Sequence, residues 1–270
     1  MAALPQTRSI ETALDKGWLS LSFNRPENRN ALTDELVGEL TETLEMVRPD
    51  RTVRGITLRG KGGVFCAGGD LKAFQSGFHG DAASPEQVAK ANRAGGELFE
   101  LINTMPQVVV ALVDGPAVAG GMGMVCCADV VVVTKGAKFA LTETQRGIVP
   151  AQIAPYIVRR LGLRHARRLM LTGQRFSGQQ AEEYGLSDFL VDDAAGFDGV
   201  EAEIITDVMR CAPGANAVTK QVVQAVPYLS TDEMKDYAAE GFARCMLSEE
   251  GREGIASFIE KRKPSWVEQS

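Results

Sequence analysis

A run of small and apolar residues in the middle of the chain, residues 110–124, constrains the fold more than any other feature. Its sequence is VALVDGPAVAGGMGM, in which a valine-rich stretch typical of a buried strand precedes the glycine turn Gly120-Gly121 and the start of a helix. The first amides of a helix have no partner within the helix and lie at the positive end of its dipole. We therefore expect a backbone amide at this turn to face a cleft and to bind developing negative charge there.

A second turn of the same kind occurs earlier in the chain. Residues 64–71 read VFCAGGDL, a strand-like run that leads into small residues and then into a helical stretch. This turn offers a second backbone donor, and two donors that converge on one point would bind an anion better than either alone.

Length and composition exclude several classes of protein. With 270 residues, 44% of them hydrophobic, the chain can bury the core of one large domain or of one domain with a helical appendage. A net charge of −6 argues against a nucleic-acid partner, because phosphate binding generally needs a basic surface. An anionic ligand must therefore be held by local groups, against the overall field.

The five cysteines show no CxxC spacing, and their odd number among apolar neighbours predicts reduced thiols packed in the interior. The N-terminus lacks the apolar segment of a signal peptide, so we expect a soluble, cytoplasmic protein. The most apolar stretch, residues 108–133, is interrupted by Asp114, Pro116, glycines and Asp129, which argues against a membrane span.

Strand and helix signals alternate in the first two thirds of the chain, which predicts an α/β core. The expected strands are residues 18–23, 55–60, 108–113 and 130–134. Thr33 is the expected N-cap of a helix whose apolar face comprises Leu36, Leu40, Leu44 and Val47.

From about residue 151 the pattern becomes helical, with Gly162, Gly173 and Gly185 as expected helix ends. We place a domain boundary near residue 195, which divides the chain into a core of residues 1–195 and a helical region of residues 196–270. The last predicted helix, within residues 254–264, ends in a basic cluster. This cluster is either a solvated helix end or an anion-binding group.

Few side chains in the sequence are suited to acid–base chemistry. The two histidines, His79 and His165, have no partner at a metal-ligand spacing, and there is no nucleophile-elbow motif of a serine hydrolase. Glu143 follows a strand-like run and precedes a turn at residues 147–150, where partial desolvation would raise its pKa toward the range useful for proton transfer. The same position also suits a residue at the start of a helix. Asp129, before a valine run, is expected to be a buried partner of an arginine or a backbone amide.

Several motifs in this chain occur in one order: residues 24–32 (NRPENRNAL), 65–71 (FCAGGDL), 113–121 (VDGPAVAGG), 128–129 (AD), 139–143 (FALTE), 147–150 (GIVP) and 258–264 (FIEKRKP). In this order and spacing they resemble the crotonase (enoyl-CoA hydratase/isomerase) superfamily along nearly the whole chain. The resemblance implies an α/β fold with a spiral core of ββα units, followed by a C-terminal helical trimerisation region.

The resemblance also assigns roles to residues. It implies that the amides of Gly69 and Gly120 form an oxyanion hole for a thioester carbonyl, with Glu143 as the acid–base group. Coenzyme A, as part of the substrate and not as a separate cofactor, is expected along Arg25, Arg29, Ala31, Ala67, Asp70 and Leu71. Phe258 and Lys261 are expected to approach it from a neighbouring subunit of a homotrimer or a dimer of trimers. No metal, nucleic acid or membrane is expected to take part.

The chain departs from the family pattern at Gly123, where hydratases of this family usually carry a first glutamate. The arrangement with a single remaining carboxylate, Glu143, resembles that of the Δ3,Δ2-enoyl-CoA isomerases, and it also resembles that of a branch of hydratases in which the first glutamate is absent. Residues 149–160, 167–173 and 209–217 resemble the hydratases that act on isohexenylglutaconyl-CoA in acyclic terpene breakdown.

We therefore expect hydration of a branched 2-enoyl-CoA, with Glu143 activating the water. In this hypothesis Gly123 contributes to the substrate site, because the absent side chain leaves space beside the β-carbon. The alternatives are a Δ3,Δ2-enoyl-CoA isomerase, a methylglutaconyl-CoA hydratase and a non-catalytic acyl-CoA-binding protein. The acyl chain, the stereochemistry and the number of subunits stay open at this point.

Overall fold

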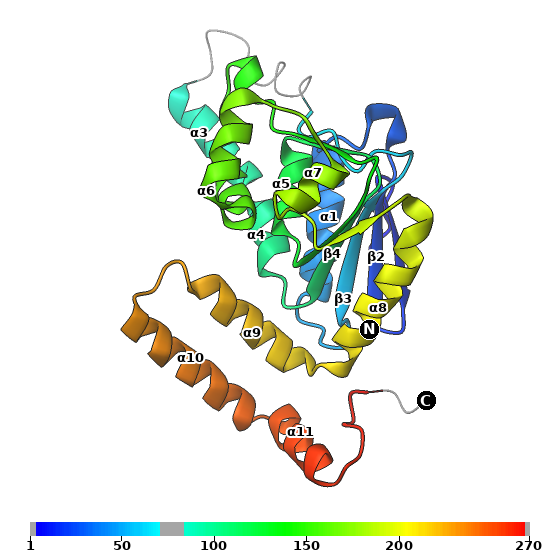
Figure 1. Cartoon of the computed structure of the whole chain (residues 1–270), viewed down its shortest axis with the longest axis vertical. Coiled ribbons are helices and arrows are strands. Elements are labelled where there is room, and N and C mark those ends of the chain that lie inside the picture. The colour runs from blue at the N-terminus through cyan, green and yellow to red at the C-terminus, as the bar shows by residue number, and fades with distance from the viewer. Residues whose placement is uncertain (1–3, 71–83, 268–270) are drawn as a thin grey trace.

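A computed structural model describes residues 4–70 and 84–267 of the chain (Figure 1). Within these residues, six strands form the main sheet in the order β1-β2-β3-β4-β6-β9. Their bounds are Ile10–Asp15 (β1), Trp18–Phe23 (β2), Gly55–Gly60 (β3), Val108–Val113 (β4), Val130–Thr134 (β6) and Phe189–Val191 (β9). β1 and β2 are antiparallel and every other neighbouring pair is parallel. The four predicted strands are confirmed.

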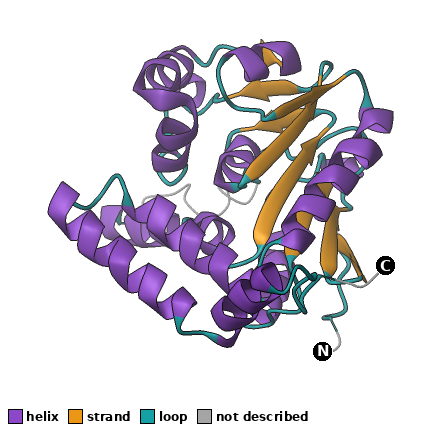
Figure 2. Ribbon diagram, turned by 60° about the horizontal axis from the view of Figure 1, so that its bottom comes forward, coloured by secondary structure: helices purple, strands orange, loops and turns teal. Residues whose placement is uncertain are grey.

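Helices cover both faces of this sheet (Figure 2). The α-helices are Asp34–Val47 (α1), Pro85–Gly95 (α3), Glu97–Thr104 (α4), Gly120–Cys127 (α5), Ala154–Thr172 (α6), Gly178–Glu183 (α7), Phe197–Arg210 (α8), Pro213–Ala225 (α9), Thr231–Met246 (α10) and Glu249–Ile259 (α11). The predicted α/β core followed by C-terminal helices is confirmed.

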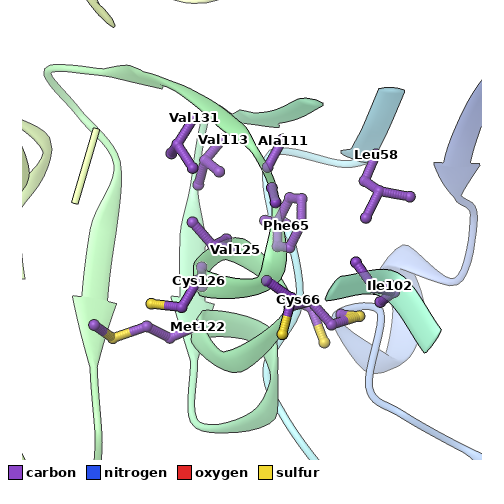
Figure 3. Packing of buried hydrophobic residues seen from close by; sticks show 14 of the residues in the cluster. Leu58, Phe65, Cys66, Ile102, Ala111, Val113, Met122, Val125, Cys126 and Val131 are labelled. Atoms are coloured by element: carbon purple, nitrogen blue, oxygen red, sulfur yellow. The ribbon is translucent and has the colours of Figure 1, made fainter. Parts of the chain in front are cut away.

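Alternate residues of the central strands point to two different hydrophobic cores, which is why these strands are valine-rich on both faces. Ala111, Val113 and Val131 pack on the face covered by α1, α4 and α5, with Phe65 and Met122 (Figure 3). On the opposite face, residues of α8 pack against the sheet, in a cluster of Trp18, Val110, Leu112, Val132, Phe197 and Ile204.

Helix boundaries follow the predicted signals. The Thr33 side chain accepts a hydrogen bond from Leu36 N at 3.2 Å, and the four apolar residues of α1 that follow it are buried. Gly162 interrupts α6 with a φ of 70°, and Gly173 ends it with a φ of 60° in the left-handed region. The strands Phe176–Ser177 (β8) and β9 also lie after residue 151, within the stretch that the sequence pattern indicated as helical.

The predicted boundary near residue 195 falls just before α8. Because α8 packs on the main sheet, the first helix of the predicted C-terminal region contributes to the core of the preceding one. α9, α10 and α11 extend away from the sheet, with α9 and α10 as an antiparallel pair (Figure 1). The division into two domains stays a prediction.

Asp129 is a structural partner of a backbone amide, as expected, although its side chain is only partly buried. Its Oδ2 accepts a hydrogen bond from Val109 N at 2.7 Å and forms an ion pair with Lys220 of α9. Lys220 Nζ also donates to the carbonyl oxygen of Gln107 at 2.6 Å. These contacts fasten α9 to the ends of β4 and α5.

Lys220→Met is therefore expected to destabilise the fold by about 1–3 kcal/mol, because it leaves the partly buried Asp129 carboxylate without the ammonium group that pairs with it. The free energy of unfolding in urea measures this. The matched control is Lys235→Met, which removes a pair with Asp232 that is exposed on both sides. Its expected effect is within about 0.5 kcal/mol, and equal losses for both variants would contradict the assignment of Lys220 as a buried tether.

Cys66, Cys126 and Cys127 are buried, as the sequence predicted. For Cys211 the prediction of apolar packing is wrong, because this residue is exposed where the chain leaves α8 and turns into α9. Among the residues described, no helix has the length and apolar character needed to cross a bilayer.

Candidate functional site

A small sheet and the loops beside it bring the two predicted glycine turns together. β5 (Pro116–Val118) pairs with β7 (Lys138–Ala140), and single bridges join Cys66 to Ala117 and Leu32 to Gly69. The connecting hydrogen bonds run from Leu32 N to Gly68 O (2.8 Å), Ala67 N to Arg29 O (3.0 Å), Cys66 N to Pro116 O (3.1 Å), Val118 N to Cys66 O (2.9 Å) and Ala119 N to Ala140 O (2.9 Å). Four segments that are distant in sequence therefore meet at one edge.

The glycines allow the two turns to touch. A Cβ atom on Gly68, which has a φ of 91°, would lie 2.8 Å from Ala119 Cβ and 3.4 Å from Gly120 N. A Cβ atom on Gly121 would lie 2.3 Å from the carbonyl oxygen of Cys66. No side chain fits in either place, so these glycines set the close approach of the turn around Gly69 to the first turn of α5.

The residue before α5 has a strained backbone. Ala119, the N-cap of this helix, has φ 53° and ψ −121°, a conformation that costs a residue with a side chain about 1–3 kcal/mol. The bend turns the chain from β5 into α5. Among the described residues, no acceptor binds the amide of Gly120, which leaves this N–H at the helix start available to an anion.

Glu143 lies just beyond β7, at the start of the 3₁₀ helix Thr144–Arg146, with 9% of its surface exposed. Its side chain makes no capping hydrogen bond, and within the described residues its Oε2 is buried without a partner. Burial raises the pKa of Glu143, while backbone amides and the Arg146 guanidinium act in the opposite direction. A desolvated carboxylate with a free oxygen is suited to accept and return a proton.

The position of Gly123 requires a correction. The expectation that its missing side chain leaves space for a branched substrate is wrong, because neighbouring side chains occupy that volume. A Cβ atom on Gly123 would lie 2.3 Å from Ile153 Cγ2 and 3.1 Å from Phe99 Cε1. Ile153 lies thirty residues further along the chain and Phe99 belongs to α4, so only the tertiary structure brings them to this position.

Leu32 and Phe99 also approach Gly120, where a Cβ atom would lie 2.8 Å from Leu32 Cδ1 and 3.6 Å from Phe99 Cζ. Together with Ile153, they form an apolar collar around the first turn of α5. The sequence did not predict that any of the three lies at this turn, although Leu32 and Ile153 fall within stretches that resemble the family, because a single apolar side chain in a helix or loop carries no signal beyond packing.

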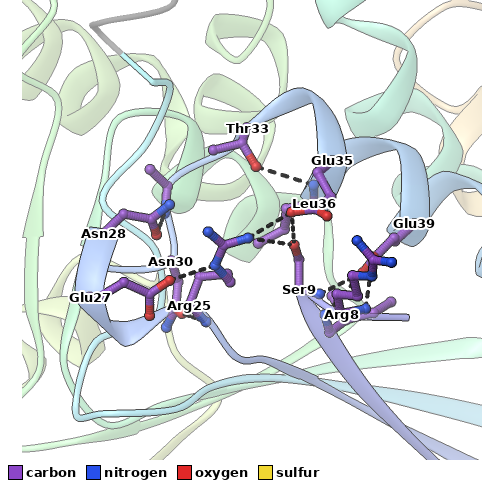
Figure 4. A network of polar contacts seen from close by, with 12 residues as sticks. Arg8, Ser9, Arg25, Glu27, Asn28, Asn30, Thr33, Glu35, Leu36 and Glu39 are labelled. Atoms are coloured by element: carbon purple, nitrogen blue, oxygen red, sulfur yellow. Dashed lines mark hydrogen bonds and ion pairs between the residues drawn. The ribbon is translucent and has the colours of Figure 1, made fainter. Parts of the chain in front are cut away.

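Two arginines predicted to contact coenzyme A lie in one loop. Arg25 Nε is 2.5 Å from Glu27 Oε1, and Arg25 Nη1 is 2.6 Å from Glu35 Oε2 and 3.3 Å from Ser9 Oγ (Figure 4). Two carboxylates thus balance the charge of Arg25. Arg29 is exposed, at a φ of 58°.

The other residues predicted to contact coenzyme A fall into three groups. Ala31, Ala67 and Asp70 are partly exposed on the segments that form the site edge. Leu71 lies outside the described residues. Phe258 and Lys261 lie at and just after the end of α11, which is at the bottom of the view in Figure 1, far below α5. Within a single chain these two residues do not reach the turn at Gly120.

The described residues contain no group of three or more histidine, cysteine, aspartate or glutamate side chains that could hold a metal ion. His165 instead stacks on Tyr184, with ring centroids 4.8 Å apart. His79 lies outside the described residues.

Known proteins resemble this chain along almost its entire length. A model of the enoyl-CoA hydratase/isomerase family matches residues 14–269. The structure of Pseudomonas aeruginosa AtuE is 42% identical, with a TM-score of 0.91, and covers 97% of this chain and 100% of its own. An enoyl-CoA hydratase/isomerase from Marinobacter aquaeolei is 34% identical, also with a TM-score of 0.91, over 96% of this chain and 99% of its own. The 1,2-epoxyphenylacetyl-CoA isomerase of Escherichia coli is 28% identical over 96% of this chain and 98% of its own length.

Proposed function

The chain belongs to the enoyl-CoA hydratase/isomerase family, and on that premise we propose that it hydrates a branched 2-enoyl-CoA of the isohexenylglutaconyl-CoA type. The observation that carries the proposal is the buried Oε2 atom of Glu143, which has no partner among the described residues and lies three residues after Ala140, the residue whose carbonyl oxygen accepts a hydrogen bond from Ala119 N. The similarity of residues 149–160, 167–173 and 209–217 to hydratases of that type and the 42% identity to AtuE support the choice of substrate.

The amides of Gly69 and Gly120 act on the thioester carbonyl. As water adds to C3, negative charge builds on the carbonyl oxygen, and two preorganised N–H donors stabilise the resulting enolate. The partial positive charge at the start of α5 acts in the same direction. The strained bend at Ala119 keeps the amide of Gly120 in place before the substrate arrives.

Glu143 provides both proton transfers. Its carboxylate takes a proton from water as the oxygen bonds to C3, and the neutral acid then delivers a proton to C2 of the enolate. The product carries one added hydroxyl and one added hydrogen, and Glu143 returns to its charged form. One carboxylate is sufficient for this cycle, and a carboxylate on the substrate can help to orient the water in place of the second glutamate of other hydratases.

Coenzyme A lies in this proposal along Arg25, Arg29, Ala31, Ala67, Asp70 and Leu71. The proposed assembly is a homotrimer or a dimer of trimers formed through the C-terminal helices, which places Phe258 and Lys261 beside the coenzyme A of a neighbouring subunit. Its support is the exposed apolar surface of these helices and their loops: Val223, Tyr228, Phe242, Leu247, Phe258 and Ile259.

A substrate panel tests the reaction. The purified chain is incubated with isohexenylglutaconyl-CoA, 3-methylglutaconyl-CoA, crotonyl-CoA and a 3-enoyl-CoA, and the products are identified by mass. The expected result is a mass gain of one water, with the largest kcat/KM for the branched glutaconyl thioesters. Movement of the double bond without a mass gain would instead identify a Δ3,Δ2-enoyl-CoA isomerase, the alternative that the single carboxylate favours. Binding without turnover would indicate a non-catalytic acyl-CoA-binding protein.

A further inference from the structure

We propose that Ile153 determines how large a substituent the site accepts at C3 of the acyl group. The inference rests on the proposed function, because it takes the first turn of α5 as the place where the thioester binds. Ile153 does not belong to the acid–base or carbonyl-binding groups described above, so it acts through shape.

The steric contact between Ile153 and Gly123 is the first observation. Ile153 is 4% exposed, and its Cγ2 atom stands where a Cβ atom on Gly123 would project, at 2.3 Å. Positions 123 and 153 therefore cannot both carry side chains at this point. Position 123 is a glycine because the Ile153 side chain covers it. At this level of α5, we take the Ile153 side chain as the wall of the site.

The position of this contact along α5 indicates which carbon of the acyl group it lies beside. Gly123 lies three residues beyond Gly120, slightly less than one helical turn, which corresponds to a rise of about 4.5 Å along the helix axis. If the amide of Gly120 holds the carbonyl oxygen, a group at the level of Gly123 faces the substituents of C3 and not the thioester itself.

Ile153 and Glu143 belong to one compact segment. Ile148 N donates to Glu143 O at 3.2 Å, Ala154 N donates to Pro150 O at 3.0 Å, and α6 begins directly after Ile153. The segment starts with the acid–base carboxylate and ends with the apolar side chain. We infer that this one segment provides both the group that transfers protons and the side chain that limits the size of the C3 substituent.

A cavity lies beside residues that neighbour Ile153 in the sequence, although Ile153 itself does not line it. It measures about 390 Å³, and its lining includes Gln152, Tyr156, Gly96 and Arg159. The Gln152 side chain donates to Asn92 Oδ1 at 2.8 Å, and the Tyr156 ring lies 6.4 Å from that of Phe99. Shortening Ile153 therefore removes buried side-chain volume next to Gly123, and the residues on either side of Ile153 in the sequence border open space.

The test uses the full chain with Ile153→Val and Ile153→Ala, and two 3-branched 2-enoyl-CoA substrates that differ only in the length of the C3 substituent. The expected result is a graded rise in the ratio of kcat/KM for the longer over the shorter substrate, reaching about tenfold for the alanine variant. The matched control is Val149→Ala, in the same segment but 70% exposed, which should leave the ratio unchanged. Thermal melts verify folding, and the valine variant provides the result if the alanine variant does not fold.

Binding of the saturated, unreactive acyl-CoA analogues separates the two proposals. A shift in binding preference with Ile153→Val, in a protein that hydrates neither substrate, supports the role of Ile153 and contradicts the proposed reaction. Hydration with an unchanged size preference in both Ile153 variants overturns the role of Ile153. A shift of equal size in Val149→Ala overturns it as well.

Discussion

Glu143→Gln is expected to lower the rate of hydration by about 10²–10⁴-fold, the usual contribution of a positioned acid–base group. Glutamine has nearly the same shape but cannot take a proton from water, so kcat should fall while KM changes little. Steady-state kinetics on the preferred enoyl-CoA measure both. The control is Glu45→Gln on the exposed surface of α1, which should keep full activity. A folded Glu143→Gln protein with near-normal kcat would exclude Glu143 as the proton-transfer group.

The pH dependence follows from the same carboxylate. Burial raises the pKa of Glu143 above its ordinary value of 4.5, and the reaction needs the charged form, so kcat should fall as the pH drops through this raised pKa. The stability of the fold depends on pH in the opposite direction, since the contribution of Glu143 to it decreases as the pH rises. A raised folded-state pKa stabilises the fold below the unfolded value, and this contribution is lost as the pH rises through the folded value. Glu143→Gln should therefore melt at a higher temperature than the natural chain at neutral pH, and the difference should vanish below about pH 4.5.

Gly121→Ala is expected to reduce kcat by about 10²-fold and to destabilise the fold by about 1–3 kcal/mol. The added methyl group would lie 2.3 Å from the carbonyl oxygen of Cys66, and backbone on both sides cannot yield without moving α5 away from the neighbouring turn. Such a shift would separate the amides of Gly69 and Gly120, the two proposed donors to the thioester carbonyl, so the transition state would lose one of them. The rate on the preferred substrate and the free energy of unfolding are measured together.

The control for this variant is Gly38→Ala, a glycine in the exposed part of α1 with no atom within 4 Å of an added Cβ. It should stabilise the chain by about 0.5–1 kcal/mol, because alanine loses less backbone entropy in a helix, and it should leave kcat unchanged. If Gly121→Ala were as active as Gly38→Ala, the close contact of the two turns would not be needed for carbonyl binding.

The fold was predictable where the signal is local. The strand of residues 108–113 and the helix capped by Thr33 follow from residues within one or two turns of each other, and both are confirmed. β1 and β5 were not predicted, and β7 was indicated only as the strand-like run that precedes Glu143. β5 and β7 have only three residues each, and each depends on a partner segment elsewhere in the chain for its hydrogen bonds. Strands of three residues are too short to show the alternation of apolar and polar residues by which a strand is recognised in a sequence.

The candidate site divides in the same way. The glycine turns and Glu143 were identified from their own neighbours, since a turn after a strand and before a helix can be recognised locally. The collar residues Phe99 and Ile153 were missed, and the space expected at Gly123 is filled by them. Whether a glycine leaves a void depends on which side chain from another element faces it, and the residues around the glycine do not contain that information.

The sequence by itself therefore determined the family, through short motifs in a fixed order along the chain, and it indicated the two glycine turns and Glu143 as the proposed acid–base carboxylate, because each of these is recognised from its immediate neighbours. Only the tertiary structure decided that Gly68 and Gly121 bring those turns into contact, and that Ile153 closes the wall over Gly123. The physical reason is packing: contacts between segments thirty or more residues apart set the width of the site, and the segments must fold against each other before that width exists.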